Sequence, residues 1–145
     1  MKILVQKVIS ASVTVNEHIV SEIKQGYLLF VGVEKEDDKS KADYLAKKVA
    51  NFRIFTDEND KMNLSIQDVG GEILAVSQFT LAADLSRGNR PGFDTAAIPQ
   101  IAEPLYEYFV KQLKSFNLQV KTGIFQADMK VSLINDGPCT FLLQK

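Results

Sequence analysis

Two hydrophobic periodicities succeed one another along this chain, and their order constrains its fold more than any other feature. Apolar residues nearly alternate over residues 2–16, which predicts a long strand, and the continuous apolar run YLLFVGV at 27–33 predicts a strand buried on both faces. From Ala42 to Phe52 the apolar residues instead recur every three or four positions, as on one face of a helix. The same helical spacing returns over residues 96–115.

Short apolar stretches between and after the two helices predict the remaining strands. Asp37 or Asp38 is expected to cap the first helix. The order is then strands, helix, strands, helix, strands, and 145 residues are an ordinary length for one domain. We therefore predict a single domain over residues 1–145, of mixed α/β class, with a sheet-rich core and two main helices. The further strands are expected at 19–24, 53–56, 72–81, 118–123, 128–134 and 139–144, with NDGP (135–138) as a short link before the last of them.

Charge and cysteine content exclude several classes of protein. The 17 basic and 18 acidic residues give a net charge of −1, which argues against a broad basic face that coats nucleic acid but permits a local phosphate contact. The single cysteine, Cys139, excludes an internal disulfide framework and a cysteine-rich zinc site. No stretch approaches the roughly 20 apolar residues of a membrane span. The simplest interpretation is a soluble cytosolic protein without a metal ion or other cofactor.

Two polar segments stand apart as places where chemistry is possible. SQFTL at 77–81 ends an apolar strand with a Ser-Gln pair, and polar residues at a strand end are well placed to form a site on a rigid element. NDGPCT at 135–140 carries turn residues, and X–Pro is the kind of bond that adopts the cis form. By residue chemistry alone, an ordinary strand end and a plain hairpin turn are the favoured interpretations.

Three other features have a simpler structural interpretation beside a functional one. A Ser-His-Asp hydrolase would have to use His18, the only histidine, but no motif surrounds it and a surface histidine is favoured. DENDK at 57–61 lacks the central glycine and the terminal glutamate of a calcium loop, so a solvated turn is favoured. In the polar loop 82–94, Arg87 and Arg90 suit a phosphate or belong to an ordinary solvated loop.

Taken together, the motifs resemble one family over essentially the whole chain. SQFTL (77–81) and the NxGPxT pattern (135–140) form the paired signature of the D-aminoacyl-tRNA deacylases, also called D-tyrosyl-tRNA deacylases. Two departures, Cys139 before Thr140 and Gly92 after Pro91, leave the polar residues of both motifs unchanged. Further matches follow in the expected order: VQKV (5–8), ASVTV (11–15), GYLLFVGV (26–33), GNRPGF (88–93) and TGIFQADMKVSLINDGP (122–138).

This resemblance implies a three-layer α/β/β fold and a homodimeric enzyme that hydrolyses the ester of D-aminoacyl-tRNA. Gly137 and a cis Pro138 would act as a chirality filter, inserted from one subunit into the active site of the other, with their carbonyl groups receiving the ammonium group of the substrate. An L side chain would be driven into this filter, whereas glycine has none to exclude, so glycyl-tRNA is expected as a second substrate. Asn135 and Met129 are expected at the substrate-binding site, and Arg87 and Arg90 are candidates for tRNA contact.

The catalytic residues that the resemblance implies are Ser77, Gln78, Phe79 and Thr80. Backbone N–H groups near Phe79 and Thr80 would form an oxyanion hole, and a terminal ribose hydroxyl of the tRNA would assist the hydrolysis. Ser77 and Gln78 would position the substrate. Thr80 as a covalent nucleophile is the rival mechanism, and it needs an activating base. Two other functions stay open, a nucleic-acid-binding module without catalysis and a Ser/Thr esterase acting on small molecules.

Overall fold

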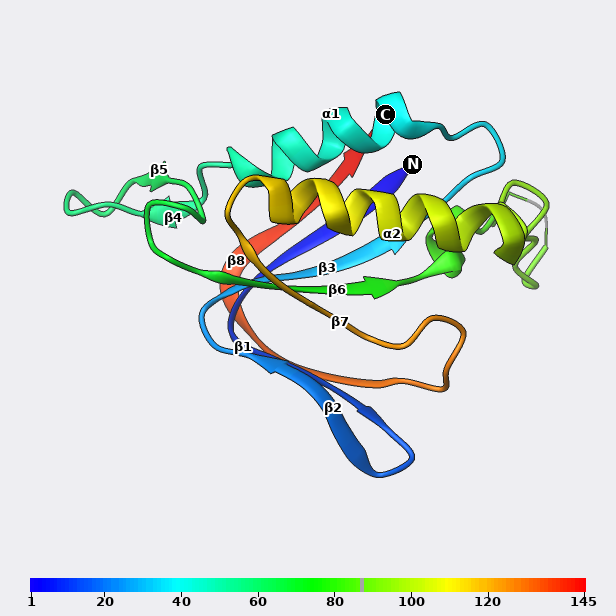
Figure 1. The fold of residues 1–145 in the computed structure, drawn as a ribbon, viewed down its shortest axis with the longest axis horizontal. Helices are drawn as coiled ribbons and strands as arrows, with labels where there is room; N and C mark the ends of the chain where they lie inside the picture. The colour runs from blue at the N-terminus through cyan, green and yellow to red at the C-terminus, as the bar shows by residue number, and fades with distance from the viewer. Residues whose placement is uncertain (87) are drawn as a thin grey trace.

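The computed structural model describes residues 1–86 and 88–145. Its elements follow the predicted order of strands, helix, strands, helix and strands (Figure 1). In chain order they are β1 (Lys2–Val15), β2 (His18–Ile23), β3 (Gly26–Gly32), α1 (Lys39–Ala50), β4 (Phe55–Thr56), β5 (Met62–Leu64), β6 (Glu72–Ser77), the 3₁₀ turn η1 (Phe79–Ala82), α2 (Pro99–Ser115), β7 (Gln119–Thr122) and β8 (Lys130–Gln144).

A six-stranded mixed sheet forms the centre of the molecule, and β1 is the strand around which it is built. β1 pairs antiparallel with β2 and β3 along one edge and with β8 along the other. β3, β6 and β7 then run parallel to one another. The apolar run at 27–33 therefore lies between β1 and β6, and its side chains are apolar on both faces because each face of the sheet is covered by an apolar core.

Two apolar cores lie on opposite faces of this sheet. α1 and α2 run side by side across one face (Figure 1), and the larger core fills the space between these helices and the sheet. On the other face the second half of β1 curls away together with β2 and the first half of β8, and a smaller core lies inside the bend. This is the predicted three-layer α/β/β arrangement. The smaller core comprises Val8, Ala11, Val13, Ile23, Leu28, Leu74 and Val76.

The first residues of each helix explain where that helix begins. The side chain of Asp38 accepts a hydrogen bond from the N–H of Lys41 at 2.9 Å, so Asp38 caps α1 as predicted. α2 begins at Pro99 and not at residue 96. Proline favours the first helical turn because its fixed φ suits the helix and its missing N–H is not needed there.

The predicted turn at 135–138 is wrong. Residues 130–144 form one strand, β8, which pairs with β1 on both sides of the NDGP segment. Thr140 lies opposite Gln6 and Asn135 lies opposite Val8, so the residues between them bulge out of the ladder. The turn-forming residues make a bulge and no reversal, because β1 offers a hydrogen-bonding partner to both halves of the strand.

One strand end and one short strand also differ from the prediction. β6 ends at Ser77 and not at 81, because the chain turns there into η1. β5 was not predicted; it follows the DENDK turn and pairs with β4 as a short hairpin. Over residues 1–86 and 88–145, no helix combines the length and the apolar character needed to cross a membrane.

Candidate active site

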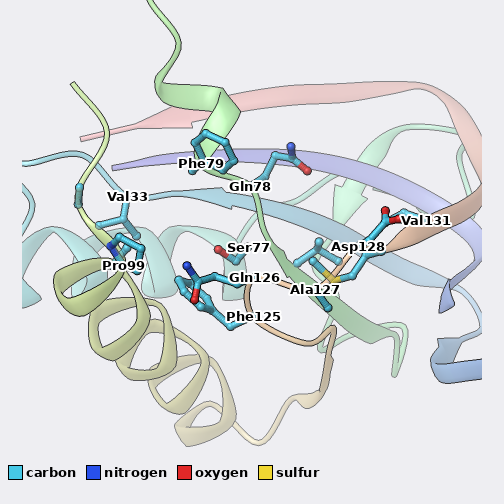
Figure 2. Close-up of a pocket in the computed structure, with 14 residues that line it drawn as sticks. Val33, Ser77, Gln78, Phe79, Pro99, Phe125, Gln126, Ala127, Asp128 and Val131 are labelled. Atoms are coloured by element: carbon cyan, nitrogen blue, oxygen red, sulfur yellow. The ribbon is translucent and has the colours of Figure 1, made fainter. Parts of the chain in front are cut away.

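A cavity of about 600 Å³ opens at the carboxyl ends of the parallel strands β3 and β6 (Figure 2). Clefts at this edge of a parallel sheet are common binding sites, because the loops that leave neighbouring strands diverge there. The segment that follows β7 and the start of α2 complete the wall. The cavity is lined by Val33, Val76, Ser77, Gln78, Phe79, Ala97, Pro99, Ala102, Phe125, Gln126, Ala127, Asp128, Met129 and Val131.

A close approach to β3 holds the SQFTL segment at this edge. The N–H of Gln78 donates to the carbonyl of Val31 at 2.8 Å, which continues the sheet one residue beyond β6. A Cβ atom on Gly32 would lie 2.8 Å from the Cβ of Leu81 and 3.2 Å from the carbonyl oxygen of Gln78. Because Gly32 has no side chain, η1 packs directly against the end of β3. This contact fixes the position of the SQFTL segment relative to the sheet.

Two neighbouring N–H groups are left available at the start of η1. The N–H of Leu81 donates to the carbonyl of Gln78, and the N–H of Ala83 donates to the carbonyl of Thr80. Within the part of the chain that the structure describes, the N–H groups of Phe79 and Thr80 donate to no other group. Unpaired N–H groups at the first positions of a helical turn are suited to binding an oxygen that carries negative charge.

The cavity holds little that can act as a base. Of the described residues that line it, only Asp128 has a titratable side chain, and its carboxylate lies 2.7 Å from Nζ of Lys130 in a solvent-exposed pair. The hydroxyl of Thr80 accepts a hydrogen bond from the side-chain amide of Gln78, and an amide does not take up a proton at neutral pH. His18 lies at the start of β2, with Nδ1 2.6 Å from the carbonyl of Asn16, and does not line the cavity.

The opposite wall of the cavity is the segment between β7 and β8. Met129 packs over Gly123, where a Cβ atom would lie 2.5 Å from the methionine sulfur, so a side chain at this position would displace Met129 from its present place. Behind the wall the ring of Phe125 lies 6.1 Å from that of Tyr106. The hydroxyl of Tyr106 donates to the carbonyl of Ala75 at 2.9 Å, and burial raises the pKa of this phenol. Met129 lines the same cavity as Ser77, Gln78 and Phe79.

The NDGP bulge stands apart from this cavity. Asn135, Gly137 and Pro138 are exposed, and none of them lines the cavity of their own chain. The bond between Gly137 and Pro138 is cis. The sequence indicated two segments as candidate sites, SQFTL and NDGPCT. Within one described chain, only SQFTL lies at the cavity.

Sequence reasoning missed the ion pair that anchors the bulge. Nζ of Lys7 lies 2.9 Å from the carboxylate of Asp136 and 5.7 Å from the centre of the Phe55 ring, and only 6% of Lys7 is exposed. A signal for it exists in the sequence. Lys7 occupies the phase of the strand alternation that Ile3 and Val5 fill with buried apolar side chains, and a lysine at a buried position needs a partner.

Phe93 brings the loop 82–94 into contact with Phe79, which lines the cavity. The rings of Phe93 and Phe79 are 5.0 Å apart, and paired hydrogen bonds between Asp84 and Gly92 close the base of the loop. Arg90 is exposed on this loop. Arg87, the other candidate for tRNA contact, lies outside the described residues.

Proteins similar to this chain match it over its whole length. A profile described as D-Tyr-tRNA(Tyr) deacylase matches residues 4–144. A relative from Pelobacter propionicus is 54% identical over 100% of both chains, and one from Pseudoalteromonas translucida is 58% identical over 99% of both. Both relatives are named D-aminoacyl-tRNA deacylase.

Solved structures give the same fold. One named c-Myc DNA Unwinding Element Binding Protein superposes with a TM-score of 0.94 at 39% identity and covers 100% of this chain and 99% of that chain. A probable eukaryotic D-amino acid tRNA deacylase has a TM-score of 0.82 and covers 98% and 97%, and at 14% identity it shows the fold alone. From the profile match and the identity of full-length relatives we conclude that this chain belongs to the D-Tyr-tRNA(Tyr) deacylase family.

Proposed function

We propose that this protein is a hydrolase that cleaves the ester between a D-amino acid and tRNA and releases both. Glycyl-tRNA is a second substrate and L-aminoacyl-tRNA is rejected, so the enzyme proofreads chirality for translation in the cytosol. The observation that carries this proposal is the SQFTL segment at the cavity, with two available N–H groups and almost no titratable side chain, in a member of this family. An aminoacyl ester is labile enough to be hydrolysed by so sparse a site.

In this mechanism the N–H groups of Phe79 and Thr80 bind the oxygen on which negative charge develops. A donor of this kind contributes about 2.7–4 kcal/mol to the stability of the transition state. Ser77 and Gln78 position the substrate, and Met129 on the facing wall borders the same space. The 2′-hydroxyl of the terminal ribose supplies the proton transfer, because the one titratable side chain among the described lining residues, Asp128, is exposed and paired with Lys130.

Chirality is read across a homodimer. The exposed Gly137 and Pro138 enter the cavity of the second subunit, beside Asn135, and their carbonyl groups receive the substrate ammonium. Two features support this arrangement. The bulge lies outside the cavity of its own chain, and the Lys7–Asp136 pair holds it in a fixed place on the sheet.

We expect the protein in solution to be a dimer, because one chain alone would present a cavity without its filter. Sedimentation equilibrium at assay concentration should give about twice the 16.2 kDa mass of the chain. Deacylation measured on the same samples across a dilution series should fall as the dimer dissociates. A species of monomer mass with full activity would contradict the cross-subunit filter.

Catalysis without a side-chain nucleophile predicts that Thr80→Ala and His18→Ala each keep measurable deacylation of D-Tyr-tRNA. Loss of a true nucleophile costs several orders of magnitude in rate, as triad knock-outs do, whereas loss of a positioning hydroxyl costs about tenfold. Thr80→Ser is the matched variant that keeps the hydroxyl. The Thr80 mechanism would be established by a correctly folded but inactive Thr80→Ala protein, together with an acyl-Thr80 adduct found by mass spectrometry.

A second function has one observation in its favour. The structural relative at 39% identity is named for binding a DNA unwinding element, which supports a nucleic-acid-binding module without catalysis. The net charge of −1 argues against tight non-specific binding. The two functions are separated by incubating the protein with D-Tyr-tRNA, since only the hydrolase releases free tyrosine.

A further inference from the structure

Two phenylalanine rings stand exposed in contact with each other at the edge of the cavity. Phe79 is 55% exposed and Phe93 is 37% exposed, although each ring lies against the other at 5.0 Å with an interplanar angle of 56°. Phe79 lines the cavity, and its ring lies next to η1 beside Gln78 (Figure 2). Two exposed aromatic rings in contact form a continuous flat apolar surface, and apolar surface gathered in one place is a common feature of binding sites.

The pair is held in place by the backbone on both sides. Phe79 belongs to η1, which packs on Gly32 of the sheet. Phe93 follows Gly92, whose two hydrogen bonds with Asp84 measure 2.8 and 3.0 Å, and the hydroxyl of Thr95 donates to the carbonyl of Ala82. The rings therefore form a prearranged surface, which lowers the entropy cost of binding a flat partner.

The chemistry of the pair and its position indicate what the partner is. In the proposed function the cavity holds the terminal aminoacyl-nucleotide. Phe79 lines this cavity and Phe93 lies against Phe79, so an RNA strand that leaves the cavity on this side would pass both rings. Aromatic faces bind any base by stacking, without reading its identity. We propose that Phe79 and Phe93 form a stacking platform for the nucleobase next to the terminal adenosine of the tRNA. This inference rests on the proposed function and adds a binding site to it.

The charges around the platform make stacking the main contribution. Arg90 is exposed on the same loop and suits the phosphate that joins the two nucleotides. Asp94 is exposed beside Phe93, and the carboxylate of Asp84 accepts the N–H of Ser86 at 2.9 Å within its own loop. Because the two arginines and two aspartates in the sequence of loop 82–94 cancel in formal charge, the expected affinity depends little on salt compared with a basic groove.

The test compares a full substrate with a minimal one. Phe93→Ala is expected to lower kcat/KM for D-Tyr-tRNA by about 10- to 100-fold, mainly through KM, because a stacked base is lost. D-tyrosyl-adenosine, which lacks the preceding nucleotide, should be hydrolysed at the wild-type rate. Phe93→Tyr keeps the aromatic face and should restore the reaction on tRNA. Tyr44→Ala on α1, which also removes an exposed aromatic ring, is the control and should change neither reaction.

A binding measurement makes the inference independent of catalysis. Uncharged tRNA carrying 2-aminopurine in place of the base before the terminal adenosine should lose fluorescence on binding to the wild-type protein, and Phe93→Ala should abolish this quenching.

Equal slowing of both substrates by Phe93→Ala would mean that the ring only shapes η1, and would overturn the platform. Unchanged kinetics and unchanged quenching in Phe93→Ala would also overturn the platform. The proposed function would still hold in that case if the wild-type protein hydrolyses D-Tyr-tRNA. Quenching without hydrolysis would keep the platform and refute the hydrolase.

Discussion

D-Tyr-tRNA whose terminal ribose lacks the 2′-hydroxyl is expected to be hydrolysed at least about 100-fold more slowly than the natural substrate. General acid–base assistance contributes about 10²- to 10⁴-fold to enzymatic rates, and the lining of the cavity offers no side chain for this role apart from the exposed, paired Asp128. If the 2′-hydroxyl of the substrate supplies this assistance, removal of the hydroxyl should abolish most of the catalysis while the oxyanion contacts remain.

Single-turnover release of tyrosine from tRNA ending in adenosine or in 2′-deoxyadenosine measures this effect. Each enzymatic rate is divided by the spontaneous rate of the same ester, because the ribose hydroxyl also accelerates hydrolysis in water. Dissociation constants of the two uncharged tRNAs provide the control for binding. Equal enzymatic enhancement with both substrates would show that the protein carries its own base, and the sparse site described above would need another explanation.

Gly137→Ala is expected to lower the rate on D-Tyr-tRNA by about 100-fold or more without affecting folding. Within its own chain an added Cβ atom would meet only Nδ2 of Asn135, at an ordinary 3.8 Å, so the substitution has room. In the cavity of the second subunit the same methyl group would face the substrate, where a clash in a rigid site is not relieved. An unchanged unfolding temperature together with lost activity is the expected result.

Mixing two inactive variants tests whether the site is shared. Ala127→Phe fills the cavity but keeps the bulge, and Gly137→Ala keeps the cavity but alters the bulge. Random exchange of subunits produces about half mixed dimers, each with one complete site, so about one quarter of wild-type activity should return. Wild-type protein mixed with each variant gives the reference for exchange. No recovery after verified exchange would place the filter and the cavity in the same subunit.

The sequence was a good guide to this fold wherever one periodicity extended far enough. Both helices and the buried strand at 27–33 were predicted because a stripe or a continuous run leaves few alternatives. The turn at 135–138 was predicted wrongly, since Asn, Asp, Gly and Pro have the same local preferences in a turn and in a bulge. What decides between them is the partner strand β1, which begins near the other end of the chain.

The candidate site shows the same division between local and distant information. The motif SQFTL identified Ser77, Gln78 and Phe79, and the resemblance named Met129. Nothing in the sequence indicated that Phe125 to Asp128 line the same cavity, because that contact depends on the parallel pairing of β6 with β7. The two available N–H groups of η1 were expected from the resemblance. The packing that positions them against Gly32 depends on the pairing of β3 with β6, which periodicity does not specify.

The pairing of β1 with β8 also has a consequence for folding during synthesis. Lys2 lies opposite Gln144 in the ladder. β1 therefore cannot pair along this edge until β8, which is synthesised much later, is available. A sheet closed by contacts so distant in sequence has a high contact order, and such domains fold on the order of milliseconds to seconds, well behind helical bundles. Until β8 leaves the ribosome, one edge of β1 and the smaller core beneath it stay open to other chains. β8, the strand that carries the bulge, is therefore also the strand whose pairing with β1 ends the period of greatest aggregation risk.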